Sequence, residues 1–530
     1  MERNVSPTVN LGNVVVSFVF KNNIVIDNIS SNLIGVFISV RCFVNQRPRL
    51  VYLAVAGVIL SGALAAAAGE VNATSPSSAP PASFRTILTV KDTDARLSEQ
   101  PVTPIGKAAD NSIATVFIDP AKQFQTIEGF GGAFTEAAAV TWHKMGPANQ
   151  HAIINAYFDS ATGHGYTLCR THINSCDFST SNYAYDEVAG DTELKHFSIA
   201  RDQQALLPMI HAALAASKAP FKLFATPWSP PAWMKTNGQM NHGGKLKPEY
   251  PQAWADYFVR YLQEYEKQGV NLWGLTMQNE PEADSPWDNC LYSPVEQRDF
   301  IRDYLGPTMK RAHLQNVKIM AWDHNRDDMV EYADAIYADP VASRYIWGTA
   351  YHWYSDGAFQ NMAMHHDAWP EKPMLSTEAC QDNGPHIGEW NPGERYGSAI
   401  ISDLNRWSVG WVDWNLVLDE RGGPNHANNF CGAPIIADTK NDKLLFQSSY
   451  YYLGHFARFI RPGAKRILCS SSQNNIEETA CINPDGTVAV VVLNRNPDPV
   501  RFNLKSRHTA TQVSLPAHSI ATYLIKEQDL

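Results

Sequence analysis

The stretch "VNLWGLTMQNEPE", residues 270–282, decides the fold, because an apolar run in it turns abruptly polar. "VNLWGL" reads as a buried strand, whereas "TMQNEPE" crowds two acids, two amides and a proline against its end. Such a change is typical of a barrel strand at the point where it leaves the core and meets substrate. The role of the Glu280 carboxylate therefore depends on a partner elsewhere in the chain.

Apolar runs of this kind alternate with amphipathic helical stretches from about residue 125 to residue 410. In residues 251–269, large apolar side chains recur at helical spacing, and Gly269 stands where a C-terminal cap belongs. Near-continuous apolar strands in series with helices predict a (β/α)8 barrel. The eight expected strands are "TIEGFGG", "GYTLCRTHIN", "FKLFATPWS", "VNLWGLTMQNE", "VKIMAWDHN", "IWGTAYHWY", "KPMLSTEA" and "GWVDWNLVLDE".

Short alternating strands flank this region on both sides. "TILTV" and "ATVFI" precede it, and "RILCSS", "GTVAVVVLN", "VRFNL" and "HSIATYLI" follow, after a last helical stretch at 448–460. We therefore expect an α/β protein, a TIM barrel with an appended β-sandwich domain built from both ends of the mature chain. The expected limits are 84–118 for the N-terminal sandwich strands, 119–461 for the catalytic barrel and 462–530 for the C-terminal sandwich.

The N-terminal region resembles an export signal placed inside a longer leader. Residues 47–70 carry two arginines, an apolar run and a small-residue end, which is typical of a cleaved signal peptide. A membrane anchor is the alternative, because the run approaches the roughly 20 residues that span a bilayer. Either interpretation predicts export to the periplasm or the extracellular space. Residues 71–83 form a Ser/Pro/Ala linker, and 1–46 are an unassigned extension outside the fold.

Composition narrows the partners of this chain. It has 530 residues, 44% of them hydrophobic, so it can bury a large core. A formal net charge of −10 without a long Lys/Arg block argues against nucleic acid or an anionic membrane surface and favours a neutral ligand. No stable membrane span is expected after signal cleavage. Among the eight cysteines, Cys469 and Cys481 flank a hairpin-like segment and are the first candidates for a disulfide bridge.

Three polar or glycine-rich segments have plainer interpretations than a ligand site. "GFGG", residues 129–132, lacks the spacing of a dinucleotide loop or a P-loop, so we interpret it as a tight turn. "WDHNRDD" at 322–328 and "HHD" at 365–367 lack further ligands at recognisable spacing, which favours solvated loops. No cysteine pair has C-x-x-C spacing either. The sequence therefore predicts no metal site and no cofactor.

Glu280 at the end of strand four and Glu378 at the end of strand seven should face each other across the barrel mouth. Carboxylates about 5 to 5.5 Å apart cleave a glycosidic bond with retention, one as nucleophile and the other as acid and then base. Their proximity should keep one of them protonated at neutral pH, as the acid role requires. We expect Glu280 to be the acid/base and Glu378 the nucleophile, with Asn279 beside the sugar 2-hydroxyl.

Aromatic and polar residues at the other strand ends suit a sugar. Flat apolar rings pack on the C–H faces of a pyranose, and amide or carboxylate groups bind its hydroxyls. The competing interpretation is structural: Trp228, Trp233 and Trp414 could be core aromatics, Trp233 most readily, and Arg170 a barrel ion pair. A single strand-end glutamate could also be structural.

Seven motifs follow one another along the chain: "EGFGGAFTEAAA", "SCDF", "TPWSPPAWMKTNG", "TMQNEPE", "HWY", "STEAC" and "DWNLVLDERGGPN". Together and in this order they resemble glycoside hydrolase family 30, the glucosylceramidase family. The resemblance, from about residue 84 to the C-terminus, implies a TIM barrel with a side β-sandwich, a retaining mechanism and a carbohydrate or glycolipid substrate. It further implies that Glu280 is the acid/base, that Glu378 is the nucleophile and that Arg170 contacts it. The implied glycone subsite consists of Asp177, Trp228, Asn279, Tyr354 and Trp414.

One position departs from the glucosylceramidase pattern. His426 follows "GGPN", where those enzymes have an aromatic residue, so the aglycone side stays open. Members of the family also hydrolyse β-1,6-glucan, β-glucosides or β-xylosides. Two alternatives from other classes are a non-catalytic carbohydrate-binding protein and a metal-dependent hydrolase that uses the His/Asp clusters.

Overall fold

The computed structural model describes residues 82–355 and 357–530 in full, and within the first 81 residues only the backbone of five strands. These strands form two small antiparallel sheets, β1–β2 and β3–β4–β5. Their bounds are β1 (Thr8–Leu11), β2 (Val14–Ser17), β3 (Ile24–Asn32), β4 (Gly35–Val44) and β5 (Arg47–Ala54). Most of the expected leader, signal peptide and linker lies outside the fully described residues, so those assignments stay predictions.

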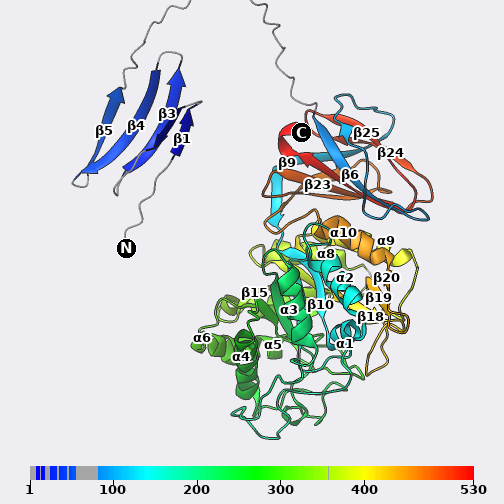
Figure 1. Cartoon of the computed structure of the whole chain (residues 1–530). Helices are drawn as coiled ribbons and strands as arrows, with labels where there is room; N and C mark the ends of the chain where they lie inside the picture. The colour runs from blue at the N-terminus through cyan, green and yellow to red at the C-terminus, as the bar shows by residue number, and fades with distance from the viewer. Residues whose placement is uncertain are drawn as a thin grey trace, which may run out of the picture. The chain divides into compact units, whose positions relative to one another are not determined.

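Eight parallel strands in sequence order close into a barrel, as the apolar runs predicted. Two of them, β10 and β15, are labelled in Figure 1. The strands are buried on both faces, which explains their near-continuous apolar character. They are β10 (Gly129–Phe134), β11 (Leu168–Ile173), β12 (Lys222–Pro227), β13 (Gly274–Thr276), β14 (Lys318–Asn325), β15 (Ile346–His352), β16 (Met374–Glu378) and β17 (Ser408–Asn415).

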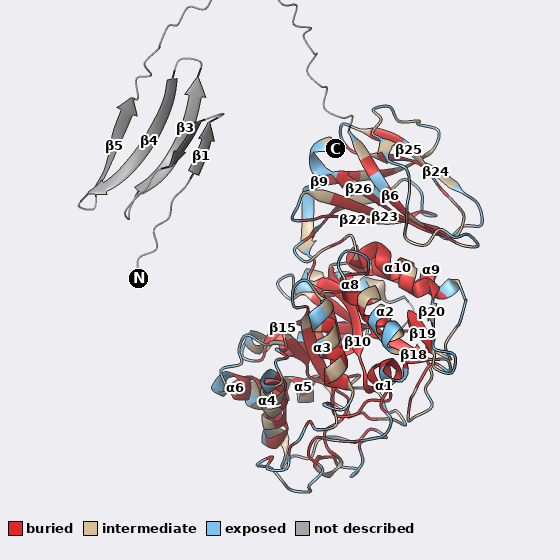
Figure 2. Cartoon of the chain, in the orientation of Figure 1, coloured by how far each residue is buried: buried red, intermediate tan, exposed pale blue. Residues whose placement is uncertain are grey.

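Helices lie around the barrel and bury their apolar sides against it (Figure 2). The expected helix at 251–269 is α4 (Pro251–Lys267), with proline in its first turn and Gly269 in the left-handed region just beyond it. The other α-helices are α1 (Glu136–Lys144), α2 (Pro147–Phe158), α3 (Leu206–Ala216), α5 (Pro294–Phe300), α6 (Gly306–Arg311), α7 (Met329–Tyr337), α8 (Phe359–Ala368), α9 (Asn391–Leu404) and α10 (Ser448–Ala457). None of the helices in the described residues is long and apolar enough to cross a membrane.

The second domain is a β-sheet domain that mixes strands from before and after the barrel. Its sheet order is β25-β24-β9-β21-β22-β23-β26-β6-β7, with β8 on β6. The early strands are β6 (Ser83–Val90), β7 (Ser98–Glu99), β8 (Thr103–Pro104) and β9 (Ala114–Thr126). The late strands are β21 (Lys465–Ser471), β22 (Glu477–Ile482), β23 (Thr487–Asn494), β24 (Val500–Lys505), β25 (Ala510–Leu515) and β26 (Ser519–Lys526).

Helix α10 joins the two domains. His455 on its buried face contacts the hydroxyl of Thr522 on β26 at 2.8 Å and that of Thr89 on β6 at 2.9 Å. Burial lowers the pKa of His455 to about 3, so the imidazole is neutral and uses one nitrogen as donor and one as acceptor. One side chain therefore ties the helix to an early and a late strand of the sheet.

The expected bridge between Cys469 and Cys481 is wrong, because both are free thiols in the structure. They lie on neighbouring antiparallel strands, β21 and β22, but Arg466 rather than Cys469 is opposite Cys481. This register places the two cysteines three positions apart along the ladder. A disulfide needs Cα atoms within about 7 Å, which adjacent cross-strand positions satisfy and this offset does not.

The "GFGG" segment is also not the turn that its glycines suggested. It lies in β10, which pairs with the parallel strand β11. A Cβ atom on Gly131 would lie 1.7 Å from the Leu168 carbonyl oxygen, a backbone atom that cannot rotate away. Gly131 therefore permits the close approach of the first two barrel strands.

Replacing Gly131 tests this packing constraint. We expect Gly131→Ala to lower the free energy of unfolding by at least about 2 kcal/mol, because the barrel must open to admit the methyl group. The matched control is Gly432→Ala, whose added Cβ would meet its nearest neighbour at 3.5 Å. Chemical denaturation of the three proteins measures the effect. Equal stability of the two variants would contradict it.

Candidate active site

Arg170 is the fully buried centre of the site at the carboxyl ends of the barrel strands. Its guanidinium donates to Glu378 Oε2 at 2.5 Å and to Asp323 Oδ2 at 3.0 Å. It also donates to Asn279 Oδ1 at 2.9 Å and to Thr226 Oγ1 at 3.1 Å. The Arg170 guanidinium thus connects its own strand, β11, with β12, β14 and β16. It also contacts the segment that follows β13. An isolated buried guanidinium would be very costly, so these acceptors are a condition of the fold.

The carboxylate of Asp323 is a second buried charge in the site. The interpretation of residues 322–328 as a solvated loop is therefore wrong at this position. It has no exposed surface and lies in β14, where Trp322 and Asp323 adopt left-handed backbone angles beside a register shift. The hydroxyls of Thr276 and Thr377 each donate to its carboxylate at 2.6 Å. Burial alone would raise the pKa of Asp323, but Arg170 and the hydrogen bonds hold it well below the ordinary value.

His352 at the end of β15 connects this carboxylate with Glu280. Its Nε2 lies 3.1 Å from Asp323 Oδ1, and its Nδ1 lies 3.1 Å from Glu280 Oε1. Burial lowers the pKa of His352, but the charge on Glu378 and the two hydrogen-bonded carboxylates raise it to about 9. The imidazole is therefore protonated at neutral pH, and both of its nitrogens donate.

Glu280 lies beyond β13 on a backbone that few residues other than glycine adopt, with φ of 46°. Its own N–H donates to the Asp323 carbonyl at 2.9 Å, and the Asn279 N–H donates to the Pro227 carbonyl at 2.8 Å. These bonds to neighbouring strands fix the strained turn. A conformation of this kind costs on the order of 1–3 kcal/mol and persists where the surroundings determine it, often at functional sites.

Glu378 is the last residue of β16 and is nearly buried. Besides the Arg170 contact, its Oε1 accepts a hydrogen bond from the Tyr354 hydroxyl at 2.9 Å. One oxygen from each glutamate and a nitrogen of His352 all lie within 4.8 Å of one another. Inverting glycosidases hold their carboxyl groups roughly 6.5–9.5 Å apart, whereas retaining ones hold them about 5–5.5 Å apart. The geometry therefore fits retention.

The pKa shifts of the two glutamates differ from the sequence expectation. Burial raises the pKa of Glu378, despite the opposing charges of His352 and Arg170. Burial acts on Glu280 too, but the hydrogen bond from His352 and the charge of His324 bring its pKa below the ordinary value. Burial thus favours the neutral form of Glu378, whereas the contact with His352 favours the charged form of Glu280.

Trp228 and Trp414 form the aromatic wall of the site. Their rings stack at 5.1 Å between centroids, and the Arg170 guanidinium lies 4.8 Å from one ring and 5.3 Å from the other. Each tryptophan is 2% exposed, yet both line the cavity. Trp233 lies outside it, half-buried and packed against Tyr250.

Asp177 also lines the cavity. The amides of Asn425 and Asn429 donate to its Oδ2 at 3.3 and 3.2 Å. Burial and the charge of Glu378 raise its pKa to about 7. His426 does not line the cavity; its Nε2 lies 3.1 Å from a carboxylate oxygen of Asp288.

The cavity at the barrel mouth has a volume of about 300 Å³. Of the eight residues expected from the sequence, seven line it, and Arg170 lies behind them as a buried support for Glu378. The seven are Asp177, Trp228, Asn279, Glu280, Tyr354, Glu378 and Trp414. The structure adds lining residues that the sequence analysis did not select: Phe178, Trp287, His324, Asn325, Cys380, Asp382, Asn429 and Cys431.

The remaining His/Asp cluster, residues 365–367, is likewise not a solvated loop. It lies in α8, where His365 is buried and its Nε2 is 2.8 Å from the Thr349 hydroxyl. Within the fully described residues, two other groups of side chains have the spacing of metal ligands: Glu280–His352–Glu378 and Cys380–Asp382–Cys431. In the first, both nitrogens of His352 already bond carboxylates, which makes it an ion-pair network.

A TIM barrel with two facing carboxylates, a sugar-sized cavity and an aromatic wall defines a glycoside hydrolase. Residues 127–460 match the glycosyl hydrolase family 30 TIM-barrel domain, and residues 463–523 match the family 30 beta sandwich domain. The chain belongs to glycoside hydrolase family 30, a family of retaining enzymes.

Several relatives support this assignment. The chain is 36% identical to the lysosomal acid glucosylceramidase of Mus musculus over 430 residues, which is 78% of this chain and 83% of the relative. It is 27% identical to the endo-1,6-beta-D-glucanase BGN16.3 of Trichoderma harzianum, over 76% of this chain and 84% of the relative. The structure of SrfJ from Salmonella typhimurium is 37% identical, with a TM-score of 0.81, and the match covers 84% of this chain and 99% of SrfJ.

The raised pKa of His352 makes stability depend on pH in a predictable direction. Its folded pKa of about 9 exceeds the ordinary 6.5, so its contribution is complete below about pH 6.5 and is lost as pH rises through 9. The full contribution is about 3 kcal/mol. We expect the difference in unfolding free energy between wild type and His352→Gln to shrink over this range.

Denaturation of both proteins from pH 6 to 10 measures this difference. The carboxylates of Asp177 and Asp413, whose raised pKa values also lie near neutrality, are present in both proteins and largely cancel. Parallel stability curves for wild type and variant would show that His352 is not held as a cation.

Proposed function

We propose that this enzyme hydrolyses β-glucosides, with Glu378 as nucleophile and Glu280 as acid and then base. The observation that carries the proposal is the asymmetry of the two carboxylates. Glu378 accepts from the Arg170 guanidinium at 2.5 Å and from the Tyr354 hydroxyl at 2.9 Å, which fix its orientation. Glu280 stands on a strained turn at the edge of the same cavity, near enough to reach the glycosidic oxygen.

In the first step, Glu378 attacks the anomeric carbon while Glu280 protonates the departing oxygen. The two carboxyl groups share one proton, and the productive arrangement places it on Glu280 while Glu378 stays ionised. Arg170 and Tyr354 favour that arrangement because both donate to the charged form of Glu378. As the sugar bonds to Glu378, the charge of Arg170 stays balanced by Asp323 at 3.0 Å.

In the second step, Glu280 is ionised and takes a proton from the incoming water. The lowered pKa of Glu280 and its contact with protonated His352 suit this stage, because a carboxylate must be charged to act as base. The water then displaces Glu378 from the anomeric carbon, and two inversions give net retention.

Asn279 contributes to sugar binding through its amide nitrogen. Arg170 has only donors, so the Asn279 atom that it contacts at 2.9 Å must be the carbonyl oxygen. The amide nitrogen is then the atom that can donate to a sugar hydroxyl beside Glu280. We assign the 2-hydroxyl to it, and further hydroxyls to Asp177 and its two asparagine neighbours.

Glucosylceramide is the substrate that we favour. The relatives with 36–37% identity include the mouse lysosomal glucosylceramidase and "Putative glucosylceramidase 4" of Caenorhabditis elegans. The departure at His426 leaves the glycone side intact, because its side chain contacts Asp288 outside the cavity. A volume of about 300 Å³ is at the low end for ligand sites and suits one terminal sugar.

Endo-β-1,6-glucan hydrolysis is the second candidate. The structure of the endo-β1,6-glucanase BT3312 is 30% identical, with a TM-score of 0.75, over 84% of this chain and 99% of that enzyme. An endo-acting enzyme needs room for sugar units on both sides of the cleaved bond, which the compact cavity does not favour.

We also propose that the mature enzyme is exported and begins after a signal peptide at 47–70. The apolar run with small residues at its end supports this assignment. The mature chain then contains the linker 71–83, the barrel 119–461 and a sandwich from 84–118 and 462–530. Mass spectrometry of the N-terminal peptide of secreted protein tests the cleavage, and a chain that retains residues 47–70 would contradict it.

Removing Glu280 tests the assignment of the two glutamates. With an aryl β-glucoside whose leaving group needs no acid, Glu280→Ala should still form the intermediate and then stall, since no base activates water. Added azide should speed turnover at least tenfold and give a β-glycosyl azide. Glu378→Gln is the matched control, because azide should not restore its retaining reaction. Rescue of Glu378→Gln instead would reverse the two roles.

A substrate panel tests the specificity. We expect kcat/KM for glucosylceramide to exceed that for β-1,6-glucan at least tenfold, and an aryl β-glucoside to be cleaved faster than the aryl β-xyloside. Reducing-sugar release and glucose detection measure both comparisons. Preference for β-1,6-glucan with internal cleavage would favour the second candidate.

A further inference from the structure

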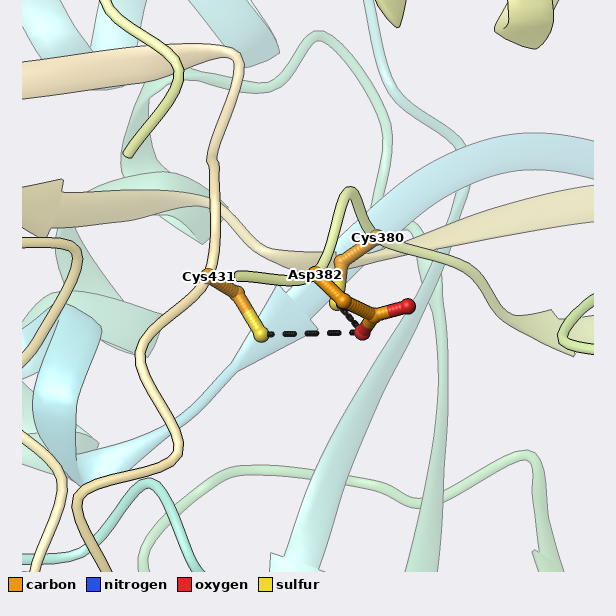
Figure 3. Close-up of side chains that lie close together, drawn as sticks. All are labelled: Cys380, Asp382 and Cys431. Carbon is orange, nitrogen blue, oxygen red and sulfur yellow. Dashed lines mark hydrogen bonds between the residues drawn. The ribbon is translucent and has the colours of Figure 1, made fainter. Parts of the chain in front are cut away.

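Two thiols and a carboxylate converge on one wall of the cavity. Figure 3 shows that Cys380 and Cys431, from separate segments, both point toward the same oxygen of Asp382. Cys380 Sγ lies 3.8 Å and Cys431 Sγ 4.0 Å from Asp382 Oδ1. One ligand atom from each of the three residues lies within 4.8 Å of the others. The proposed reaction uses none of these groups.

The backbone explains this convergence. Asp382, just after β16, pairs with Cys431 in an isolated antiparallel bridge. Two further backbone hydrogen bonds, from Gly432 to Gln381 and from Gly384 to Phe430, join the same two segments at 2.8 and 2.9 Å. Residues directly opposite in such a bridge place their side chains on one face, and alternate residues along extended backbone share a face. Cys380, two residues before Asp382, therefore joins the cluster.

We propose that Cys380, Asp382 and Cys431 bind a thiophilic divalent cation such as Zn²⁺. Tetrahedral Zn²⁺ with sulfur at about 2.3 Å and carboxylate oxygen at about 2.0 Å separates a sulfur from an oxygen ligand by about 3.5 Å. The observed separations of 3.8 and 4.0 Å reach this value with side-chain movements of a few tenths of an ångström. Three protein ligands leave one position open, as in zinc sites that exchange a water or ligand.

A disulfide between the two thiols fits the structure less well. The bridge pairs Asp382, not Cys380, with Cys431, so the two cysteines are diagonal to each other. Diagonal positions on an antiparallel pair lie about 7–8 Å apart, beyond the usual Cα separation of a disulfide. Both cysteines are free thiols. A shared metal ion needs no backbone movement.

The ion would inhibit the enzyme, an effect that rests on the proposed function. All three ligands line the cavity that holds Glu378. The Tyr354 hydroxyl lies 3.4 Å from Cys380 Sγ and 2.9 Å from Glu378 Oε1, so one side chain contacts both the cation site and the nucleophile. A cation here narrows the cavity and takes up the Cys380 sulfur that the Tyr354 hydroxyl contacts, which disturbs the orientation of the nucleophile.

Cadmium titration of the whole reduced protein tests the binding. Cd²⁺ is the probe because its bonds to thiolates give an ultraviolet charge-transfer band, and Zn²⁺ should compete for the site. We expect a saturable band in wild type and in the control Cys469→Ser, whose thiol is in the sheet domain, and its loss in Cys431→Val. Asp382→Asn keeps both thiols and should weaken binding at least tenfold. No band in wild type, or an undiminished band in Cys431→Val, would overturn the proposal.

An inhibition assay, independent of the cadmium titration, tests the effect on activity. Zn²⁺ should inhibit wild type, a chelator should restore activity, and Cys431→Val should lose this sensitivity. Equal inhibition of Cys431→Val would place the inhibitory ion at Glu280, His352 and Glu378 and overturn the regulatory role. If no glycoside is hydrolysed at all, the proposed function fails while the cadmium band still decides the metal site. A wild-type mass lower by the two thiol hydrogens would show a disulfide and contradict the proposal.

Discussion

The buried guanidinium of Arg170 is the interaction on which the rest of the site depends. Its positive charge has no exposed surface, so it requires the carboxylates of Glu378 and Asp323. Those bonds connect strands β11, β14 and β16 across the barrel and fix the direction in which the Glu378 carboxylate points. The same contacts that make the charge tolerable in the core thus orient the carboxylate that we propose as the nucleophile. Fold stability and chemical function share one network here.

His352 extends this network to the other glutamate. As a cation between Asp323 and Glu280, it carries the balancing charge to the edge of the cavity. The left-handed turn at Glu280, with φ of 46°, is held by backbone bonds to strands on either side. Strain of this kind is sustained by the surrounding barrel. The two glutamates therefore differ in what holds them. Arg170 and the Tyr354 hydroxyl hold Glu378, whereas the His352 imidazolium and a strained backbone hold Glu280.

Most of the fold could be predicted from the sequence, because apolar periodicity fixes which runs are buried. The eight strands followed from the apolar runs, and the positions of Glu280 and Glu378 followed from the polarity changes at the strand ends. The burial of Asp323 could not be predicted in this way. It lies in a hydrophilic stretch of sequence, and a left-handed backbone in β14 turns its side chain into the core. The predicted bridge between Cys469 and Cys481 was wrong for a related reason. Strand register, not proximity in sequence, decides which side chains meet. The pairing of Asp382 with Cys431 likewise joins distant segments that carry no local signal.

We propose that Arg170 and Tyr354 orient Glu378 to act as the nucleophile of a retaining reaction. A β-glucoside with fluorine at the 2-position and a good leaving group slows the second step and lets the glycosyl-enzyme accumulate. Intact mass and peptide mapping of the inactivated protein then locate the sugar. We expect one fluoroglucosyl group on Glu378. Attachment to any other residue, or steady hydrolysis without a covalent adduct, would contradict it.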